Sequence, residues 1–98
     1  MLTLPIKKKW FEMIKSGEKK EEYREINVYY QNRFDKYTPI GDWKPEEFPI
    51  ILRNGYSKNS PSLKCKVTVQ VGNGKTEWGA EPNKIYYVLK ILNVEEIN

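Results

Sequence analysis

The sequence predicts an α+β fold, a small, partly open, mixed β-barrel with one main N-terminal helix and a short second helix. Three observations lead to this fold class. Helical spacing of apolar residues is confined to the N-terminal part, residues 64–71 alternate between apolar and polar, and residues 84–94 are almost continuously apolar. Late strands without intervening helices favour an antiparallel or mixed sheet. With 98 residues in all, we expect residues 1–98 to form a single domain.

The first expected elements are a short strand and the main helix. Residues 1–4 are an apolar run that Pro5 closes, and proline is tolerated in the first turn of a helix. From Ile6 to Lys15 the apolar side chains recur at helical spacing. Gly17 is the expected helix stop, because the residue after a helix often has a positive φ, which glycine adopts without steric cost.

Residues 19–25 are a highly charged stretch that we interpret as the next strand. Successive side chains of a strand point to opposite faces. The expected faces are Lys20, Glu22 and Arg24 on one side, and Lys19, Glu21, Tyr23 and Glu25 on the other. An acid and a base two residues apart would then lie side by side and could be held beside a pocket. The alternative is a solvated charged face.

A short second helix is expected over residues 28–34, with Asn27 as its N-cap, because Tyr30 and Phe34 are four residues apart. Residues 35–48 show no clear period, and we expect a loop there. Three residues of this stretch favour turns: Pro39, Gly41 and Pro45.

The C-terminal half is expected to consist of strands. Residues 48–52 are mostly apolar, and Asn54-Gly55 favours a tight turn after them. Residues 64–71 are a strand with Cys65, Val67, Val69 and Val71 on one face. Residues 72–83 are a long loop, and residues 84–94 are the closing strand. An apolar run of this kind is typical of a strand that is covered on both sides or curled into a barrel.

The composition excludes several kinds of chemistry. The chain has no histidine, so Ser-His-Asp and Cys-His catalysis and histidine metal sites are impossible. Cys65 is the single cysteine, which excludes an intrachain disulfide and fits a small buried side chain. We expect no metal and no cofactor. Without an apolar run of about 20 residues or a signal peptide pattern, we expect a cytoplasmic protein with no membrane partner.

The remaining features are compatible with a nucleic-acid partner. Aromatic residues make up 13% of the chain and the isoelectric point is near 9.1. Single-stranded nucleic acid is bound by cations on the backbone and by aromatic side chains that stack on bases. The candidates outside the expected core are Tyr56 and Trp78, and further Tyr23 and Tyr29; each of them could instead serve packing. Residues 7–9 are three lysines that form either a solvated turn or a basic rim that meets phosphate.

One pattern in the first quarter of the chain points to a family. The spacing Gly-x-Lys-x-x-Glu-x-Arg is carried by Gly17, Lys19, Glu22 and Arg24. It is similar to the signature of the ASCH domain family, whose fold is PUA-like, and residues 4–11 resemble the stretch before that signature. Three later pieces resemble small bacterial and phage members of the family: residues 52–56, 77–80 and 86–89. Residues 36–48 are the least familiar part.

The resemblance implies a domain that binds RNA or a nucleotide in a basic cleft beside the barrel. Lys19 and Arg24 would pair with phosphate or a base edge, and Glu22 would orient Arg24 or accept hydrogen bonds from an exocyclic amine. Three further residues would assist: Arg53 as a cation, and Trp78 or Tyr56 as stacking partners. The affinity of such a site would fall steeply with salt concentration.

The same resemblance implies an enzymatic alternative. One branch of the family hydrolyses N4-acetylcytidine with a lysine, a threonine and a distant glutamate. Lys19 matches the lysine, Glu22 stands at the position of the threonine, and Glu77 is the candidate for the glutamate. Other members resemble ribonucleases that use a lysine and a tyrosine, a role in which Lys19 would again be catalytic. A third reading is a domain that binds a protein partner and whose cleft is vestigial.

Overall fold

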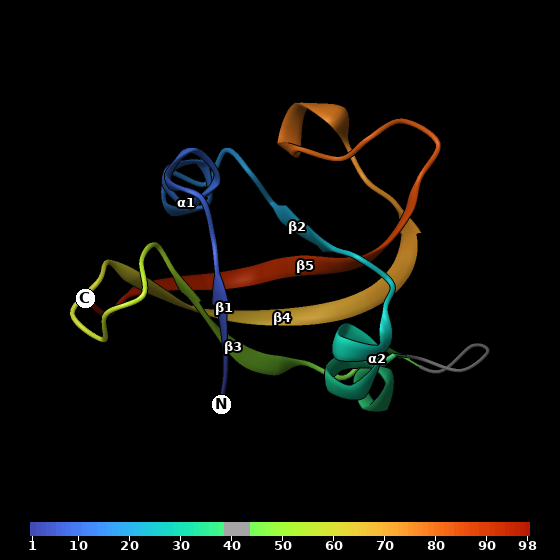
Figure 1. Ribbon diagram of the computed structural model, residues 1–98, viewed down its shortest axis with the longest axis horizontal. Coiled ribbons are helices and arrows are strands. Elements are labelled where there is room, and N and C mark those ends of the chain that lie inside the picture. The colour runs from blue at the N-terminus through green and yellow to red at the C-terminus, as the bar shows by residue number, and fades with distance from the viewer. Residues whose placement is uncertain (39–43) are drawn as a thin grey trace.

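The computed structural model describes residues 1–38 and 44–98, and within them the chain forms a five-stranded mixed sheet. The strands are β1 (Leu2–Pro5), β2 (Glu21–Arg24), β3 (Phe48–Arg53), β4 (Ser62–Asn73) and β5 (Ile85–Glu96), in the order β1-β3-β4-β5-β2. β1 runs parallel to β3, and the other neighbours are antiparallel. The sheet curls into a half-barrel (Figure 1), which confirms the predicted mixed, partly open barrel.

Two α-helices of the described chain lie outside the sheet: α1 (Lys8–Lys15) and α2 (Val28–Phe34). The short 3-10 turn η1 (Asp35–Tyr37) continues α2, and a second one, η2 (Thr76–Trp78), lies in the connection from β4 to β5. In Figure 1, α1 and the loop that carries η2 rise on either side of β2. This arrangement leaves β2 between two walls.

The helix boundaries follow from local chemistry. Gly17 has a φ of +86°, as expected for the residue that stops α1, although the helix begins at Lys8 rather than at Ile6. Asn27 caps α2 as predicted, because its side-chain oxygen accepts a hydrogen bond of 2.9 Å from the backbone N–H of Tyr30. The prediction of a loop over residues 35–48 is wrong at its start, because η1 continues the helix there. Pro39 and Gly41 lie outside the described residues.

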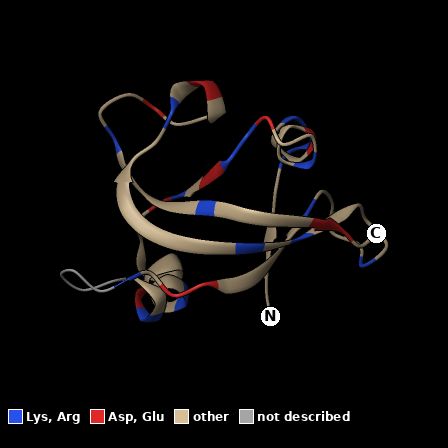
Figure 2. Cartoon of the chain, turned by 180° about the vertical axis from the view of Figure 1, so that it is seen from behind, with Lys and Arg blue, Asp and Glu red and all other residues tan. Residues whose placement is uncertain are grey.

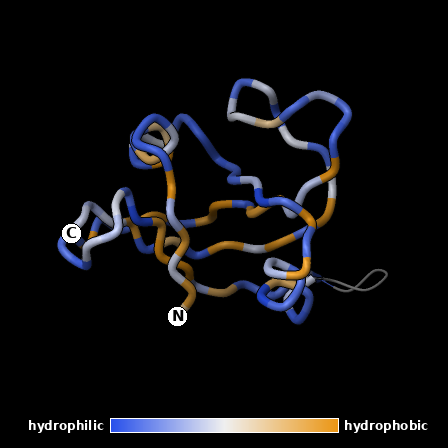
Figure 3. The backbone as a smooth tube through the Cα atoms, in the orientation of Figure 1, coloured by the Kyte–Doolittle hydropathy of each residue, from blue (hydrophilic) through white to orange (hydrophobic). Residues whose placement is uncertain are grey.

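The closing strand has apolar side chains on both faces, as its sequence indicated. Tyr87 and Leu89 point into the main core, whereas Tyr86 and Val88 pack with Ala80 in a second, smaller cluster on the opposite face. The main core also takes in α1 and α2, through Phe11, Ile14 and Phe34. Figure 3 shows the hydrophobic segments concentrated in β1, β3, β4 and β5, whereas β2 is hydrophilic.

The predicted apolar face of β4 is confirmed except at its end. Cys65, Val67 and Val69 are buried, but Val71 is 51% exposed. The reason is the shape of the sheet: β4 curls upwards near Val71 (Figure 1), so that the side chain lies at the edge of the core and is only half covered. The strand also has a bulge between Lys66 and Val67 and buries Thr68, which strict alternation would expose.

Candidate functional site

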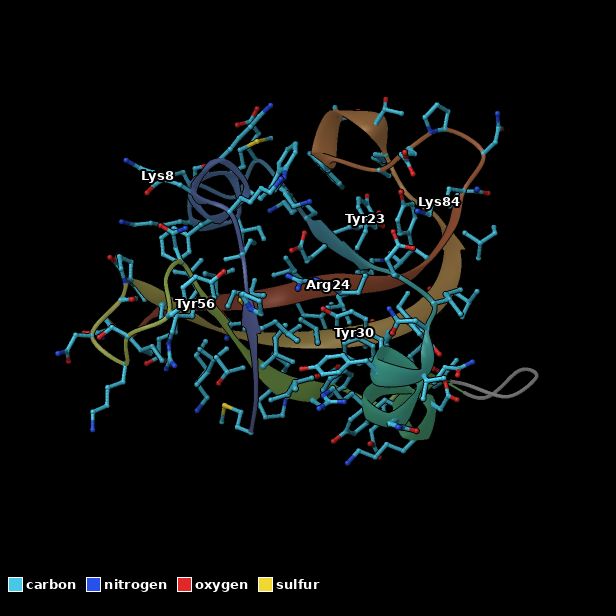
Figure 4. The ribbon with its side chains drawn as sticks, viewed as in Figure 1. Lys8, Tyr23, Arg24, Tyr30, Tyr56 and Lys84 are labelled. Carbon is cyan, nitrogen blue, oxygen red and sulfur yellow. The ribbon has the colours of Figure 1, made fainter. Side chains whose placement is uncertain are left out.

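A cleft of about 670 Å³ lies between α1, β2 and the η2 loop. Aromatic side chains from five places in the sequence line it: Trp10, Tyr23, Tyr30, Trp78 and Tyr86. The described lining residues include three cations, Lys7, Arg24 and Lys84, and three carboxylates, Glu22, Glu25 and Glu81. These charges balance one another. Figure 4 shows Tyr23, Arg24, Tyr30 and Lys84 around this space. The expected cleft beside the barrel is therefore mixed in charge rather than basic.

At the floor of the cleft, Lys19, Glu22 and Arg24 form a chain of ion pairs, which we call the buried charge chain. The Nζ of Lys19 is 3.2 Å from Oε1 of Glu22, and NH2 of Arg24 is 2.8 Å from Oε2 of Glu22. The three side chains are only 0%, 8% and 11% exposed. Breaking a buried pair leaves an uncompensated charge in a poorly solvated place. The chain of ion pairs therefore holds the two cations and the carboxylate in fixed positions.

Arg24 is further held by neighbours from two other elements. Its NH2 group donates a hydrogen bond of 2.8 Å to the backbone oxygen of Pro5, and NH1 donates one of 3.3 Å to the hydroxyl of Tyr30. Burial lowers the pKa of the guanidinium, but the carboxylate of Glu22 and the hydroxyl of Tyr30 outweigh it and raise the pKa. Arg24 is thus a permanently charged donor that is aimed by its neighbours.

Lys19 lies beneath the floor of the cleft, behind Glu22, and is not among the side chains that line it. Its ammonium donates to the backbone oxygen of Trp78 and lies 4.9 Å from the ring centroids of both Trp10 and Tyr23. Burial lowers the pKa of Lys19, and the adjacent carboxylate of Glu22 opposes that shift. Lys19 therefore links the η2 loop, through the oxygen of Trp78, to β2, through Glu22.

The predicted strand faces are correct for Glu22 and Arg24 but wrong for Lys19. The structure places Lys19 beside Glu22, because β2 begins only at Glu21 and Lys19 still belongs to the turn after α1, where its N–H bonds the oxygen of Met13 at 2.9 Å. Figure 2 shows basic and acidic segments following one another along this connection. The alternation rule applies only where the backbone is extended.

The η2 loop is fastened to the rest of the wall by further contacts. The hydroxyl of Tyr23 accepts a hydrogen bond of 2.9 Å from the N–H of Lys75 and donates one of 2.8 Å to Glu21. Gly79 has a φ of +102°, and a Cβ at this position would lie 2.9 Å from the ring of Trp10. Only glycine lets the loop lie this close to α1. The wall that carries Trp78 is therefore tied to both β2 and α1.

A second ion-pair group forms the rim of the cleft. Lys84 is 2.7 Å from Oε1 of Glu25 and 3.2 Å from Oε2 of Glu81, and these hydrogen bonds raise its pKa. Sequence reasoning missed this group, together with Trp10, Tyr30 and Tyr86. Trp10 and Tyr30 stand in helical stripes typical of core residues. No local sequence pattern marks Tyr86 or the group of Lys84, Glu25 and Glu81 as neighbours in the fold.

Other candidates lie apart from this cleft. Within the described chain, Arg53 is outside it and donates a hydrogen bond of 3.3 Å to Ser62. Tyr56 is 97% exposed in a neighbouring hollow, and Tyr29 stacks on the guanidinium of Arg33, 3.4 Å from the ring centroid. Glu77 is exposed on η2 and is not part of the described lining of the cleft.

Neither a metal cluster nor a membrane segment is found in residues 1–38 and 44–98. No group of three or more Asp, Glu or Cys side chains there could hold a metal ion. Over the same residues, no helix is long and apolar enough to cross a bilayer.

Comparisons with models of protein families, with curated proteins and with solved structures found no match to this chain.

Proposed function

We propose that this chain is an RNA- or nucleotide-binding domain whose cleft holds one unpaired base. The observation that carries the proposal is a cleft lined by aromatic rings with Arg24 and Glu22 fixed at its floor. Bases stack on aromatic side chains, and their edges present hydrogen-bond donors and acceptors. Arg24 supplies only donors and the ionised Glu22 only acceptors. Hydrogen-bond acceptors on the edge of a base would therefore find a partner in Arg24, and hydrogen-bond donors would find one in Glu22.

The balance of charges in the lining supports a base rather than a run of phosphates as the group inside. Three cations face three carboxylates among the described lining residues, and Lys19 behind Glu22 adds one further positive charge, so the interior offers only a weak net attraction to a polyanion. Neutral planar rings enter such a space without leaving a charge unpaired. A phosphate would then lie at the entrance, where Lys7 is exposed.

The resemblance to the ASCH family supports the same proposal. Its signature positions lie together: Gly17 turns the chain after α1, Lys19 follows in that turn, and Glu22 and Arg24 project from β2. We propose that the chain is a member of this family and that its signature builds the floor of the cleft.

The position of Lys19 favours binding over the hydrolase and ribonuclease alternatives. A lowered lysine pKa is what a nucleophile or general base would use. Such a lysine must also reach the substrate. The amine of Lys19 is fully buried and is occupied by Glu22 and the oxygen of Trp78. Release of acetate from N4-acetylcytidine by the wild type, and its loss in Lys19→Met, would reverse this preference.

Calorimetric titration with ribonucleosides tests the proposed function. The probes are adenosine, cytidine, guanosine, uridine and N4-acetylcytidine, followed by a ten-residue single-stranded RNA of mixed sequence. We expect saturable binding of at least one nucleoside, lost in Arg24→Ala and retained in Arg33→Ala, because Arg33 contacts Tyr29 away from the cleft. Trp78→Ala gives a second test that leaves the buried charge chain intact. Binding of none of these probes by the wild type would contradict the proposal.

A further inference from the structure

The cleft has a smaller neighbour, a hollow of about 440 Å³ that we call the side hollow. Its lining consists of Pro5, Ile6, Lys7, Asn54, Gly55 and Tyr56. Residues 5–7 also line the cleft itself, so the two spaces are separated only by the segment that joins β1 to α1. In Figure 4, β1 passes between the labelled Tyr56 and Arg24. Both volumes lie in the range of small-molecule sites.

Tyr56 presents an aromatic ring to the side hollow with no protein packed on it. It is 97% exposed and is the most exposed of the large hydrophobic side chains in the described chain. Packing cannot explain a tyrosine at this position, since it contributes almost no buried area. A ring that stands free beside a base-sized space is the feature on which a second base would stack.

The loop that carries Tyr56 is fixed relative to the cleft. The side-chain amide of Asn54 donates a hydrogen bond of 2.9 Å to the backbone oxygen of Ile6, and its backbone N–H bonds Pro61 at 2.9 Å. The N–H of Ile6 in turn donates to the oxygen of Arg53 at 3.0 Å. The segment shared by the two spaces is therefore tied directly to the loop that bears the tyrosine.

Lys7 is the one cation among the described residues that lines both spaces. It is exposed and in an extended conformation, with φ −71° and ψ 148°, immediately before α1. In single-stranded nucleic acid, a charged phosphate separates each pair of neighbouring bases. A cation between two base-sized spaces is placed where that phosphate would pass.

We propose that the chain binds single-stranded nucleic acid over at least two nucleotides, with one base in the cleft, its neighbour on Tyr56, and the linking phosphate at Lys7. The inference rests on the proposed function, because it takes the occupant of the cleft to be a base. It adds a second base subsite and identifies the ligand as a strand rather than a free nucleoside. The nearly balanced charges of the cleft are then consistent with a phosphate contact at its entrance, where Lys7 is exposed.

The test compares ribonucleosides with the matching dinucleoside monophosphates ApA, CpC, GpG and UpU. We expect the dinucleotide of the preferred base to bind at least about fivefold more tightly than its nucleoside, which is the lower end of the gain from one stacked base. Tyr56→Ala should reduce that gain to what the phosphate contact at Lys7 contributes and leave nucleoside affinity unchanged, whereas Tyr56→Phe should keep it in full. Because Tyr56 is exposed, the substitution should not disturb folding.

Salt dependence tests the phosphate contact separately. For a ten-residue single-stranded RNA, we expect Lys7→Gln to reduce the slope of log affinity against log salt by about 0.7, the value for one phosphate contact with a single strand. Lys58→Gln, an exposed lysine outside both spaces, is the matched control.

The two proposals fail in different ways. Equal affinity for nucleoside and dinucleotide, or a dinucleotide gain that is undiminished in Tyr56→Ala, would overturn the second subsite and leave the binding of one base intact. Absence of binding to every nucleoside and every dinucleotide would overturn both proposals.

Discussion

The two faces of β5 show how one strand serves two purposes. On one face, Tyr87 and Leu89 belong to a continuous apolar core that includes both helices. On the other, Tyr86 and Val88 belong to a cluster with Ala80 and Tyr23, next to ion pairs and open space. The first face gains stability from area removed from water. The second presents aromatic and charged groups that are held in place without being fully covered. Stability and ligand binding should therefore respond to different substitutions.

The largest effect should come from breaking the buried charge chain. Glu22→Gln leaves Lys19 and Arg24 without the carboxylate between them, and removing one partner of a buried pair costs about 3–5 kcal/mol. Urea denaturation gives the change in the free energy of unfolding. Glu18→Gln is the control, because Glu18 is exposed. Equal stability of the two variants would show that the chain of ion pairs does not organise the floor of the cleft.

The next largest effect should lie in the main core. Leu89→Ala should lower the free energy of unfolding by about 2–5 kcal/mol, because it removes a fully buried side chain and leaves a cavity. Leu92→Ala removes the same atoms from the same strand, at a side chain that is 46% exposed, and should cost far less. Similar midpoints of thermal unfolding for the two variants would contradict the assignment of the core.

Cys65 reports how tightly the core face is closed. Burial raises the pKa of its thiol from 9.0 to about 11 and also shields the sulfur, so at pH 8 the folded protein should react with Ellman's reagent at least about tenfold more slowly than the urea-unfolded chain. The folded state holds this proton more tightly. Its contribution to stability is therefore present below about pH 9 and is lost as the pH rises towards 11. Equal reaction rates would mean that the core opens readily.

The smallest effect on stability should come from the half-buried wall of the cleft, at Trp78. Trp78→Ala removes a half-buried ring and should leave the protein nearer to wild-type stability than Leu89→Ala does. Nucleoside affinity should fall by about 1–3 kcal/mol, the cost of losing one stacking partner. Thermal unfolding and calorimetric titration of the same preparation measure both quantities. A Trp78→Ala protein that has lost much of its stability but keeps its nucleoside affinity would contradict the assignment of stability to one face of β5 and of ligand binding to the other.

The core was predictable because its signals are local. The alternation at residues 64–71, the apolar run at 84–94, the cap at Asn27 and the stop at Gly17 each depend on a few neighbouring residues. Such patterns determine which side of a strand or helix is buried. The exposure of Val71 was not predictable, because it depends on where the curled sheet extends beyond its core.

The cleft was predictable only in part. The pairing of Glu22 with Arg24 follows from their spacing on one strand face. The burial of Lys19 does not, because it depends on the η2 loop approaching from residues far along the chain to offer the oxygen of Trp78. The group of Lys84, Glu25 and Glu81 is likewise assembled from two separate connections. Tyr56, in contrast, was singled out by its turn, but it lies in the side hollow.

We propose that the base lies in the aromatic cleft and not on the sheet surface as a whole. Amide and indole NMR shifts during titration with the tightest-binding ribonucleoside distinguish these two locations. We predict that shifts concentrate at Trp10, Glu22, Arg24, Trp78 and Tyr86, while Val71 and Leu92, which are exposed on the sheet, stay unchanged. Shifts spread evenly over the exposed strand residues, with none at Arg24 or at the indole of Trp78, would contradict it.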